Sequence, residues 1–197
     1  MPYLINKDIK NLIKTNFIRT SSSFDKNQIQ PASLDLSLSS KCYRIKASFI
    51  PNKQPISKII NELSLVQIDL NKEFLFEKNC IYLCELNESL NLPKKIKGKA
   101  NPKSTTGRLD IFTRLITEYG TEYDEIDYGY SGKLYLEIIP QSFSIELKKN
   151  ICLNQLRFFE GSEENIQKKL KISVSIKKGK VSAYRAKKIT SSINLNK

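Results

Sequence analysis

Histidine and tryptophan are missing from this sequence, which holds a single methionine and seven glycines in 197 residues. Without histidine, every zinc centre that uses imidazole is excluded. Among the four cysteines only Cys80 and Cys84 are close in sequence, while Cys42 and Cys152 stand alone. We therefore predict no metal ligand set. All four lie in apolar, strand-like surroundings, so we expect buried free thiols and no disulfides.

Long apolar runs are also missing. None approaches the roughly 20 residues that a helix needs to span a bilayer. The first residues, MPYLINKDIKNLIK, lack the apolar region of a secretory signal. The hydrophobic content of 40% is nevertheless too high for a disordered chain. We expect a soluble, cytoplasmic protein without a membrane partner, large enough for one good core.

Acidic residues are absent from residues 165–197, which carry nine lysines and Arg185 and so account for most of the formal net charge of +13. A basic segment of this kind is typical of nucleic-acid binding. Tyr184 is its only aromatic side chain, whereas binding of single strands relies on stacking of bases on aromatic rings. We keep a basic nucleic-acid-binding module as an alternative and do not expect nucleic acid as the partner.

Short apolar segments separated by turn residues dominate the first part of the chain. Residues 65–70, 74–76 and 80–86 read as strands with Asn-Lys or Lys-Asn between them. Residues 57–63 fit one helical turn. Many short strands at regular spacing predict a barrel or sandwich. We therefore predict a mainly β fold, a distorted β-barrel or jelly roll with a few short helices.

The change in charge near residue 160 predicts the domain organisation. We expect a β domain over residues 1–160, with an N-terminal helix at 6–17. Residues 161–197 are predicted to form a basic helix and arm that serves as a lid or a linker.

Residues 98–139 gather small, hydroxyl, cationic and carboxylate side chains between two strand-like segments. At the end of this stretch, strict alternation sends Leu134, Leu136 and Ile138 to one face of a strand. Glu137 lies on the opposite face. We therefore expect Glu137 to leave the core and to face a cleft or a neighbour.

Residues 103–108, KSTTGR, supply two permanent cations, three hydroxyls and one glycine. Gly107 lets backbone amides approach an anion closely, which suits a phosphate. The segment is not a P-loop, because the G-x-x-x-x-G-K-[ST] spacing is absent. An exposed turn of polar residues is the alternative interpretation.

Four motifs occur in an order and spacing that resemble the dCTP deaminase branch of the dUTPase superfamily. They are IQPASLDLSL at 29–38, KSTTGRLDIF at 103–112, IDYGYSGKLYLEI at 126–138 and ICLNQLRF at 151–158. The resemblance covers roughly residues 3 to 190 and is greatest to the long form of the family, in which two copies of the fold are fused. It implies a dUTPase-like barrel, a homotrimer or a multiple of trimers, and the reaction dCTP + H₂O → dUTP + NH₃. It also places Asp35 near a subunit contact, although a solvated strand carboxylate is an equal alternative.

The resemblance also implies a role for each matching residue. Glu137 is expected to be the general acid and base, Ser104 to position the attacking water, and Arg108 to lie near the reacting carbonyl and the phosphates. The loop with Ser104 and Arg108 is expected to complete the Glu137 site of a neighbouring subunit. The expected substrate-binding residues are Lys103, Thr105, Thr106, Gly107, Asp127, Tyr135, Tyr184, Arg185 and Lys187.

Within that set the residues serve different parts of the nucleotide. Asp127 is expected at the sugar 3′-hydroxyl and Tyr135 at the base, while Tyr184, Arg185 and Lys187 would form a lid over the triphosphate. Asp127 also fits an ordinary β-turn before Gly129. Deamination would need no zinc, unlike that of the zinc-dependent nucleobase deaminases. We expect Mg²⁺ only as an ion carried by the triphosphate.

Two departures from the single-copy relatives leave alternatives open. Residues 118–123, called the insertion below, are additional and sit where the family recognises the cytosine amino group, so base preference is in question. Lys103 replaces an arginine, which keeps the charge and loses a bidentate grip. The alternatives are a dUTP diphosphatase, alone or combined with deamination and with Asp127 orienting water, and a non-catalytic half-domain.

Overall fold

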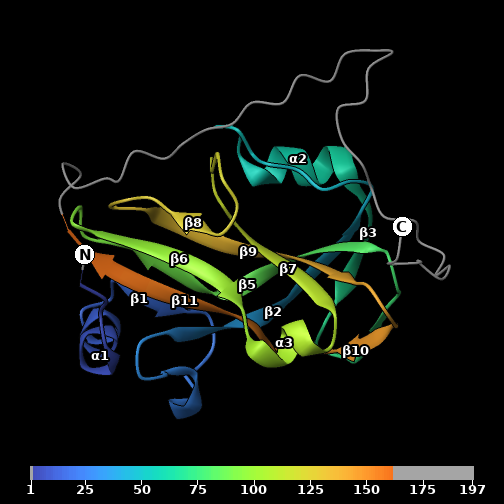
Figure 1. Ribbon diagram of the computed structural model, residues 1–197. Helices are drawn as coiled ribbons and strands as arrows, with labels where there is room; N and C mark the ends of the chain where they lie inside the picture. Colours follow the sequence, from blue (N-terminus) through green and yellow to red (C-terminus); the bar gives the residue numbers. More distant parts are fainter. Residues whose placement is uncertain (1, 162–197) are drawn as a thin grey trace, which may run out of the picture. The chain divides into compact units, whose positions relative to one another are not determined.

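The computed structural model describes residues 2–161, and all structural statements below concern this part of the chain. The elements are α1 (Asn6–Lys14), β1 (Ile18–Thr20), the short 3₁₀ helix η1 (Lys26–Gln28), β2 (Leu34–Ile45), α2 (Ile56–Leu63), β3 (Ser64–Asp69), β4 (Phe74–Phe76), β5 (Ile81–Asn91), β6 (Ile96–Pro102), α3 (Ser104–Arg108), β7 (Ile111–Thr117), β8 (Glu125–Ile126), β9 (Ser131–Pro140), β10 (Ile145–Leu147) and β11 (Cys152–Glu160) (Figure 1).

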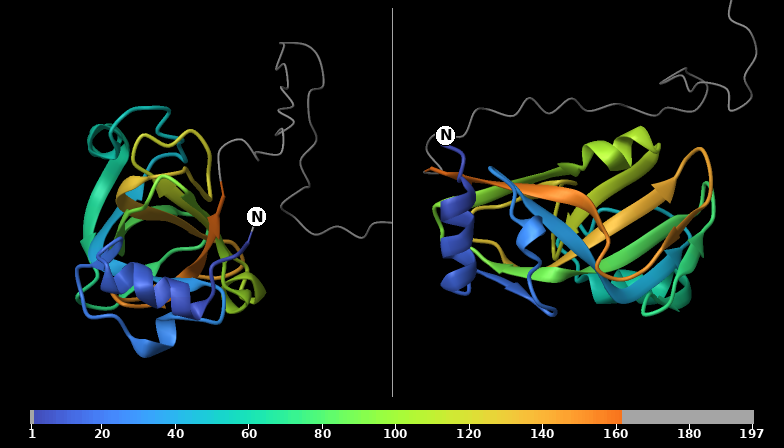
Figure 2. Two further views of the ribbon diagram at one scale, coloured as in Figure 1. Left: turned by 90° about the vertical axis from the view of Figure 1, so that its left-hand side faces the viewer. Right: turned by 90° about the horizontal axis from the view of Figure 1, so that it is seen from below.

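Antiparallel strands curl into a nearly closed barrel (Figure 2). Nine of the described strands form one sheet in the order β7-β9-β5-β2-β11-β6-β8, with β1 paired to β5 and β3 to β2, while β4 and β10 form a separate ribbon. Asp124 links the two ends of this order. Its carbonyl accepts from the Ala100 amide of β6 at 2.8 Å, and its own amide donates to the Leu115 carbonyl of β7 at 3.0 Å. The predicted mainly β, barrel-like fold is confirmed.

The long strand β2 is shared among three partners. Its residues 34–37 pair with β11, whereas residues 41–45 lie between β3 and β5. Cys42 faces Cys84 of β5, and their sulfur atoms are 2.9 Å apart. All four cysteines are free thiols; Cys42 and Cys84 are buried, while Cys80 and Cys152 are half-buried.

Alternating leucines fill the barrel interior as predicted. Leu134, Leu136 and Ile138 of β9 are all fully buried. At one end α1 closes the core with Ile9 and Leu12 (Figure 2). This helix ends at Lys14, earlier than the predicted residue 17, because the chain takes the left-handed region at Asn16, with φ 60°.

The helix α2 covers the outer face of the sheet and makes a second apolar layer there. This layer contains Ile45, Ile56, Leu83, Ile116 and Tyr135. The sheet beneath α2 is therefore buried on both faces, which period-2 alternation alone does not reveal. Within residues 2–161, none of the helices has the length and apolarity to cross a bilayer.

Candidate functional site

Glu137 lies under the second layer, on the sheet face opposite the barrel interior as its alternation predicts, but it lines neither of the two cavities described below. The side chain is 0% exposed. Alternation does place it opposite Leu136, but α2 and the insertion cover that face of the sheet (Figure 1). A buried carboxylate needs a compensating partner, and the sheet supplies one from the neighbouring strand.

That partner is Arg114, which lies directly across from Glu137 in the pairing of β7 with β9. Arg114 Nε donates to Glu137 Oε1 at 2.8 Å, and Nη2 donates to the same oxygen at 2.5 Å. The second oxygen, Oε2, is buried and has no hydrogen-bond partner within the described chain. A buried acceptor without a partner costs about 1–3 kcal/mol. The two oxygens of this carboxylate are therefore unequal: Oε1 accepts both bonds from Arg114, and Oε2 accepts none within the described chain.

Two aromatic rings frame the guanidinium of Arg114. Its Cζ lies 3.9 Å from the centroid of the Tyr123 ring and 5.0 Å from that of Phe112. Contacts of this kind stabilise a cation most when it is desolvated. The Tyr123 hydroxyl donates to the Phe49 carbonyl at 2.8 Å. Burial raises the pKa of Tyr123, and the nearby Arg114 charge opposes that rise, so the phenol stays neutral near pH 7.

The insertion is an ordered part of the second layer. The Glu118 carboxylate accepts from the Tyr135 hydroxyl at 2.8 Å and from the Ile56 amide at the start of α2 at 3.1 Å. The Gly120 carbonyl accepts from the Asn52 amide at 2.9 Å. These bonds join the insertion to β9, to α2 and to the loop before α2. The insertion therefore forms part of the cover over Glu137.

The motif helix α3 presents its polar groups outward. Ser104, Thr105 and Arg108 are exposed, and their side chains make no hydrogen bond or ion pair within residues 2–161. Thr106 is buried, and its hydroxyl donates to the Leu153 carbonyl of β11 at 2.7 Å. Thr106 thus anchors α3, in place of its predicted contact with substrate. The outward groups are available to a ligand or to a second chain.

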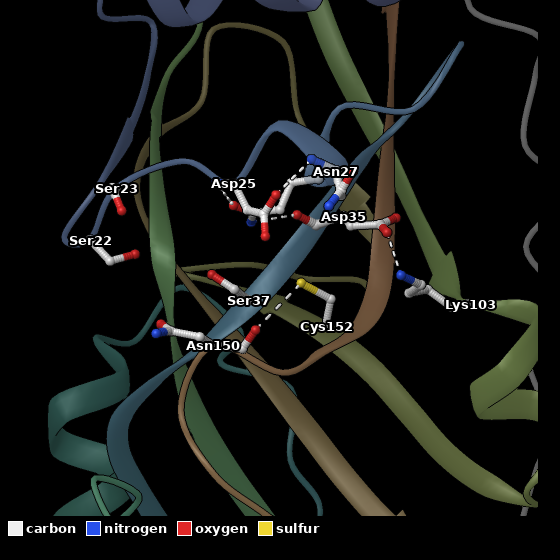
Figure 3. A pocket seen from close by; sticks show the side chains of 10 residues that line it. Ser22, Ser23, Asp25, Asn27, Asp35, Ser37, Lys103, Asn150 and Cys152 are labelled. Atoms are coloured by element: carbon white, nitrogen blue, oxygen red, sulfur yellow. Dashed lines mark hydrogen bonds and ion pairs between the residues drawn. The ribbon is translucent and has the colours of Figure 1, made fainter.

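Two cavities flank this helix. The first, of about 440 Å³, includes Lys103, which is ion-paired with Asp35 (Figure 3). The second, of about 400 Å³, includes Gly107 and Arg114. The full lining of the first is Ser22, Ser23, Asp25, Asn27, Gln28, Asp35, Ser37, Lys103, Asn150 and Cys152. The motif at 103–108 therefore reaches both cavities, one at each of its ends.

A second buried acid, Glu88, lies behind the first cavity and is 1% exposed. Its Oε1 accepts from Gln28 Nε2 at 2.8 Å and from the Ser37 hydroxyl at 2.7 Å, and its Oε2 accepts from the Ser37 amide at 2.9 Å. Burial raises the pKa of Glu88, and these hydrogen bonds oppose the rise. Both of its oxygens are satisfied by neutral donors.

The first cavity offers few carboxylate oxygens that could bind a cation. Asp25 and Asp35 line it, and Lys103 neutralises Asp35. No group of three His, Cys, Asp or Glu side chains that could hold a metal ion occurs within residues 2–161. This donor set fits Mg²⁺ that arrives on a triphosphate and keeps its phosphate and water ligands. It does not form a cage of protein ligands.

The other predicted site residues differ in burial, and three of them lie outside the described part of the chain. Asp127 is exposed in the turn between β8 and β9, where its carbonyl accepts from the Tyr130 amide at 3.2 Å. Tyr135 is buried, and its hydroxyl bonds to Glu118, so its predicted contact with the base is not favoured. Asp35 is buried and paired, which excludes the solvated carboxylate within the single chain. Tyr184, Arg185 and Lys187 lie outside the described residues.

Arg114, Tyr123 and Glu88 were not anticipated from the sequence. Arg114 carries a permanent charge inside the apolar run 111–117, and a charge there signals a partner. The identity of that partner depends on the strand register. Glu88 stands between the polar residues Asn87 and Ser89, so neither it nor Tyr123 could be singled out from the sequence.

Comparison with known proteins identifies the family of this chain. The model of the 2′-deoxycytidine 5′-triphosphate deaminase (DCD) N-terminal domain matches residues 3–162. The chain therefore belongs to this family. The crystal structure of 2′-deoxycytidine 5′-triphosphate deaminase from Agrobacterium tumefaciens is similar, with 42% identity and a TM-score of 0.78 over 81% of this chain.

The chain spans only 48% of the Agrobacterium chain. Curated relatives are closer in length. The "dCTP deaminase, dUMP-forming" of Methanosphaera stadtmanae is 29% identical over 70% of this chain and 68% of its own length. The protein of the same name from Streptomyces coelicolor is 26% identical over 79% and 78%.

Proposed function

We propose that this chain contributes the reaction centre of a dCTP deaminase, with Glu137 as the general acid and base. The inequality of the two Glu137 oxygens carries the proposal. Arg114 occupies Oε1, while Oε2 is buried without a partner in the described chain. A carboxylate held at one oxygen can exchange protons at the other. Membership of the deaminase family and the 42% identity to the Agrobacterium protein support this role.

The reaction is dCTP + H₂O → dUTP + NH₃. Glu137 Oε2 removes a proton from water while the water oxygen attacks C4 of the cytosine, and the carboxylic acid then delivers that proton to N3. A second proton follows the same route to the exocyclic amine, whose bond to C4 breaks to release ammonia. Ser104 orients the water, and the Arg108 guanidinium stabilises the negative charge of the intermediate and the phosphates.

Ser104 and Arg108 are proposed to act on the Glu137 of a neighbouring copy. Both are exposed on α3 and lack partners within residues 2–161. In a closed trimer, or a multiple of trimers, every interface repeats the same contact. Lys103 and the first cavity would receive the triphosphate with its Mg²⁺, and Asp127 the deoxyribose. The lid formed by Tyr184, Arg185 and Lys187 stays a prediction, as does a cytoplasmic location.

A second candidate is deamination combined with hydrolysis of the triphosphate, and the names of the curated relatives, "dUMP-forming", favour it. The two reactions differ in their products. The first gives ammonia and dUTP, and the second gives ammonia, dUMP and pyrophosphate.

The test is product analysis of the purified chain with Mg²⁺ and either dCTP or dUTP, in separate assays. Ammonia and dUTP in equal amounts support the first reaction, and pyrophosphate with dUMP supports the second. Pyrophosphate released from dUTP, without ammonia from dCTP, indicates a dUTP diphosphatase. No turnover of either nucleotide overturns the enzymatic proposal and leaves the non-catalytic half-domain or the nucleic-acid-binding module.

A further inference from the structure

Arg114 grips the Glu137 carboxylate in an uncommon way. An arginine fork often contacts both oxygens of a carboxylate, but here Nε and Nη2 both donate to Oε1. Two donors on one planar group fix the rotation of the carboxylate as well as its position. The grip therefore determines which oxygen remains unbound and where it lies.

The guanidinium is itself held in place by the insertion. Tyr123 stacks on Arg114 at 3.9 Å, and its hydroxyl is tied to the Phe49 carbonyl at 2.8 Å. Glu118, five residues earlier, fastens the insertion to Tyr135 and to the first residue of α2. Contacts therefore connect α2 and its preceding loop to Tyr123, Tyr123 to Arg114, and Arg114 to Glu137.

We infer that Arg114 is a positioning residue for Glu137 and that Tyr123 holds Arg114 in its working orientation. This inference rests on the proposed function and deepens it, because it gives the insertion a role in the same site. Residues 118–123 would act by orienting the acid, and direct contact with the cytosine is not required of them.

The opposing interpretation is a buried ion pair that only stabilises the fold. The two interpretations differ in what a conservative variant does. Arg114→Lys keeps the charge but supplies no planar pair of donors, so misplacement of Glu137 by about 1 Å should lower kcat for dCTP deamination on the order of 10²-fold. The KM should stay within about 3-fold, because binding of the ground state is not altered.

Tyr123 provides further variants in case Arg114→Lys fails to fold. Tyr123→Leu removes the ring and should lower kcat about 10-fold, while Tyr123→Phe keeps the ring over Arg114 and should lower it less than about 3-fold. Arg44→Lys is the matched control, since Arg44 pairs with Glu77 at 2.7 Å on a partly exposed surface. It should leave kcat unchanged.

Chemical rescue separates positioning from stability. Guanidinium chloride at a non-denaturing concentration should restore part of the kcat of Arg114→Ala, and urea at the same concentration should not. Full activity of Arg114→Lys, or the same loss in Arg44→Lys, would overturn the inference. So would an Arg114→Ala that is folded, inactive and not rescued.

The wild-type chain and Glu137→Gln, assayed in parallel, distinguish this failure from that of the proposed function. If the wild type releases ammonia, Glu137→Gln does not, and Arg114→Lys matches the wild type, the positioning role alone fails. If the wild type and Glu137→Gln behave alike, the assignment of Glu137 fails and the positioning role fails with it.

Discussion

Two glutamates are buried within residues 2–161, and they are stabilised in different ways. Glu88 on β5 accepts three hydrogen bonds from the neutral groups of Gln28 and Ser37, which satisfy both of its oxygens. Glu137 on β9 accepts two bonds from the cation Arg114, both at one oxygen. Equal burial therefore does not mean equal role. We therefore expect Glu88, whose bonds are complete, to serve the fold, and Glu137, whose Oε2 has no partner within the described chain, to be the reactive acid.

The two acids also differ in the charge of the groups that contact them. Neutral donors stabilise Glu88 without cancelling its charge, so burial raises its pKa. Arg114 supplies Glu137 with an opposite charge at hydrogen-bond distance. Removing one member of such a buried pair leaves the other uncompensated. The following changes test this comparison, beginning with the largest expected effect.

Glu137→Gln should reduce deamination of dCTP by about 10²–10⁴-fold, because an amide cannot shuttle protons. Its oxygen still accepts from Arg114, so the variant should fold. Ammonia release measures the first effect, and circular dichroism together with urea unfolding measures the second. Turnover equal to that of the wild type would remove Glu137 from the mechanism.

Glu88→Ala should lower the free energy of unfolding by about 3 kcal/mol or more, since the Ser37 amide, the Ser37 hydroxyl and the Gln28 amide would lose their common acceptor. Equilibrium unfolding in urea measures the loss. Glu88→Gln serves as the milder control, because its oxygen retains part of the network. A loss below about 0.5 kcal/mol would show that Glu88 is not a structural acid.

The raised pKa of Glu88 should also appear in the pH dependence of the free energy of unfolding. Burial raises its pKa above the ordinary value of 4.5, so the unfolded chain releases this proton at a lower pH than the folded chain. The stabilising contribution is then complete below about pH 4.5 and is lost as the pH rises through the raised pKa. The unfolding free energy of the wild type minus that of Glu88→Gln should therefore decrease with rising pH. A difference that grows with pH contradicts the assignment.

Replacement of an exposed acid should give the smallest change in the free energy of unfolding, and it serves as the reference for the two buried acids. Glu77 pairs with Arg44, and its side chain is 53% exposed. Glu77→Gln should change the free energy of unfolding by less than about 0.5 kcal/mol, since surface ion pairs are weak. Thermal unfolding at low and high salt is the measurement. A larger change would mean that burial does not separate Glu88 and Glu137 from an acid on the surface.

The strands of this fold were predictable, because they depend on local alternation. Leu34, Leu36 and Leu38 alternate with polar residues, and the structure buries all three completely. The helix at 57–63 was also found, as α2. What the pattern could not show is that α2 lies on the sheet face that carries Glu137. Coverage of a face is a tertiary property, so the sequence predicted that Glu137 leaves the barrel interior but not that α2 and its neighbours bury it completely.

The pairing of Arg114 with Glu137 could not be predicted for a related reason. In a tight hairpin the length of the turn fixes the register. Here the insertion and β8 separate β7 from β9, so the sequence leaves open which residues face each other. The cationic motif at 103–108 could be recognised. Ser104 and Thr106 both carry a hydroxyl group, however, and the sequence does not show which of them is buried. Their roles diverge only where α3 packs on β11.

The strand β2 joins regions that would otherwise be independent. Residues 34–37 at its start pair with β11, and residues 41–45 at its end lie between β3 and β5. The barrel wall near α1 and the wall beneath α2 therefore share one continuous backbone. Opening either wall strains the other, so the domain should unfold as a single cooperative unit. Amide protons in the middle of β2 are accordingly expected to exchange with solvent only when the entire barrel comes apart.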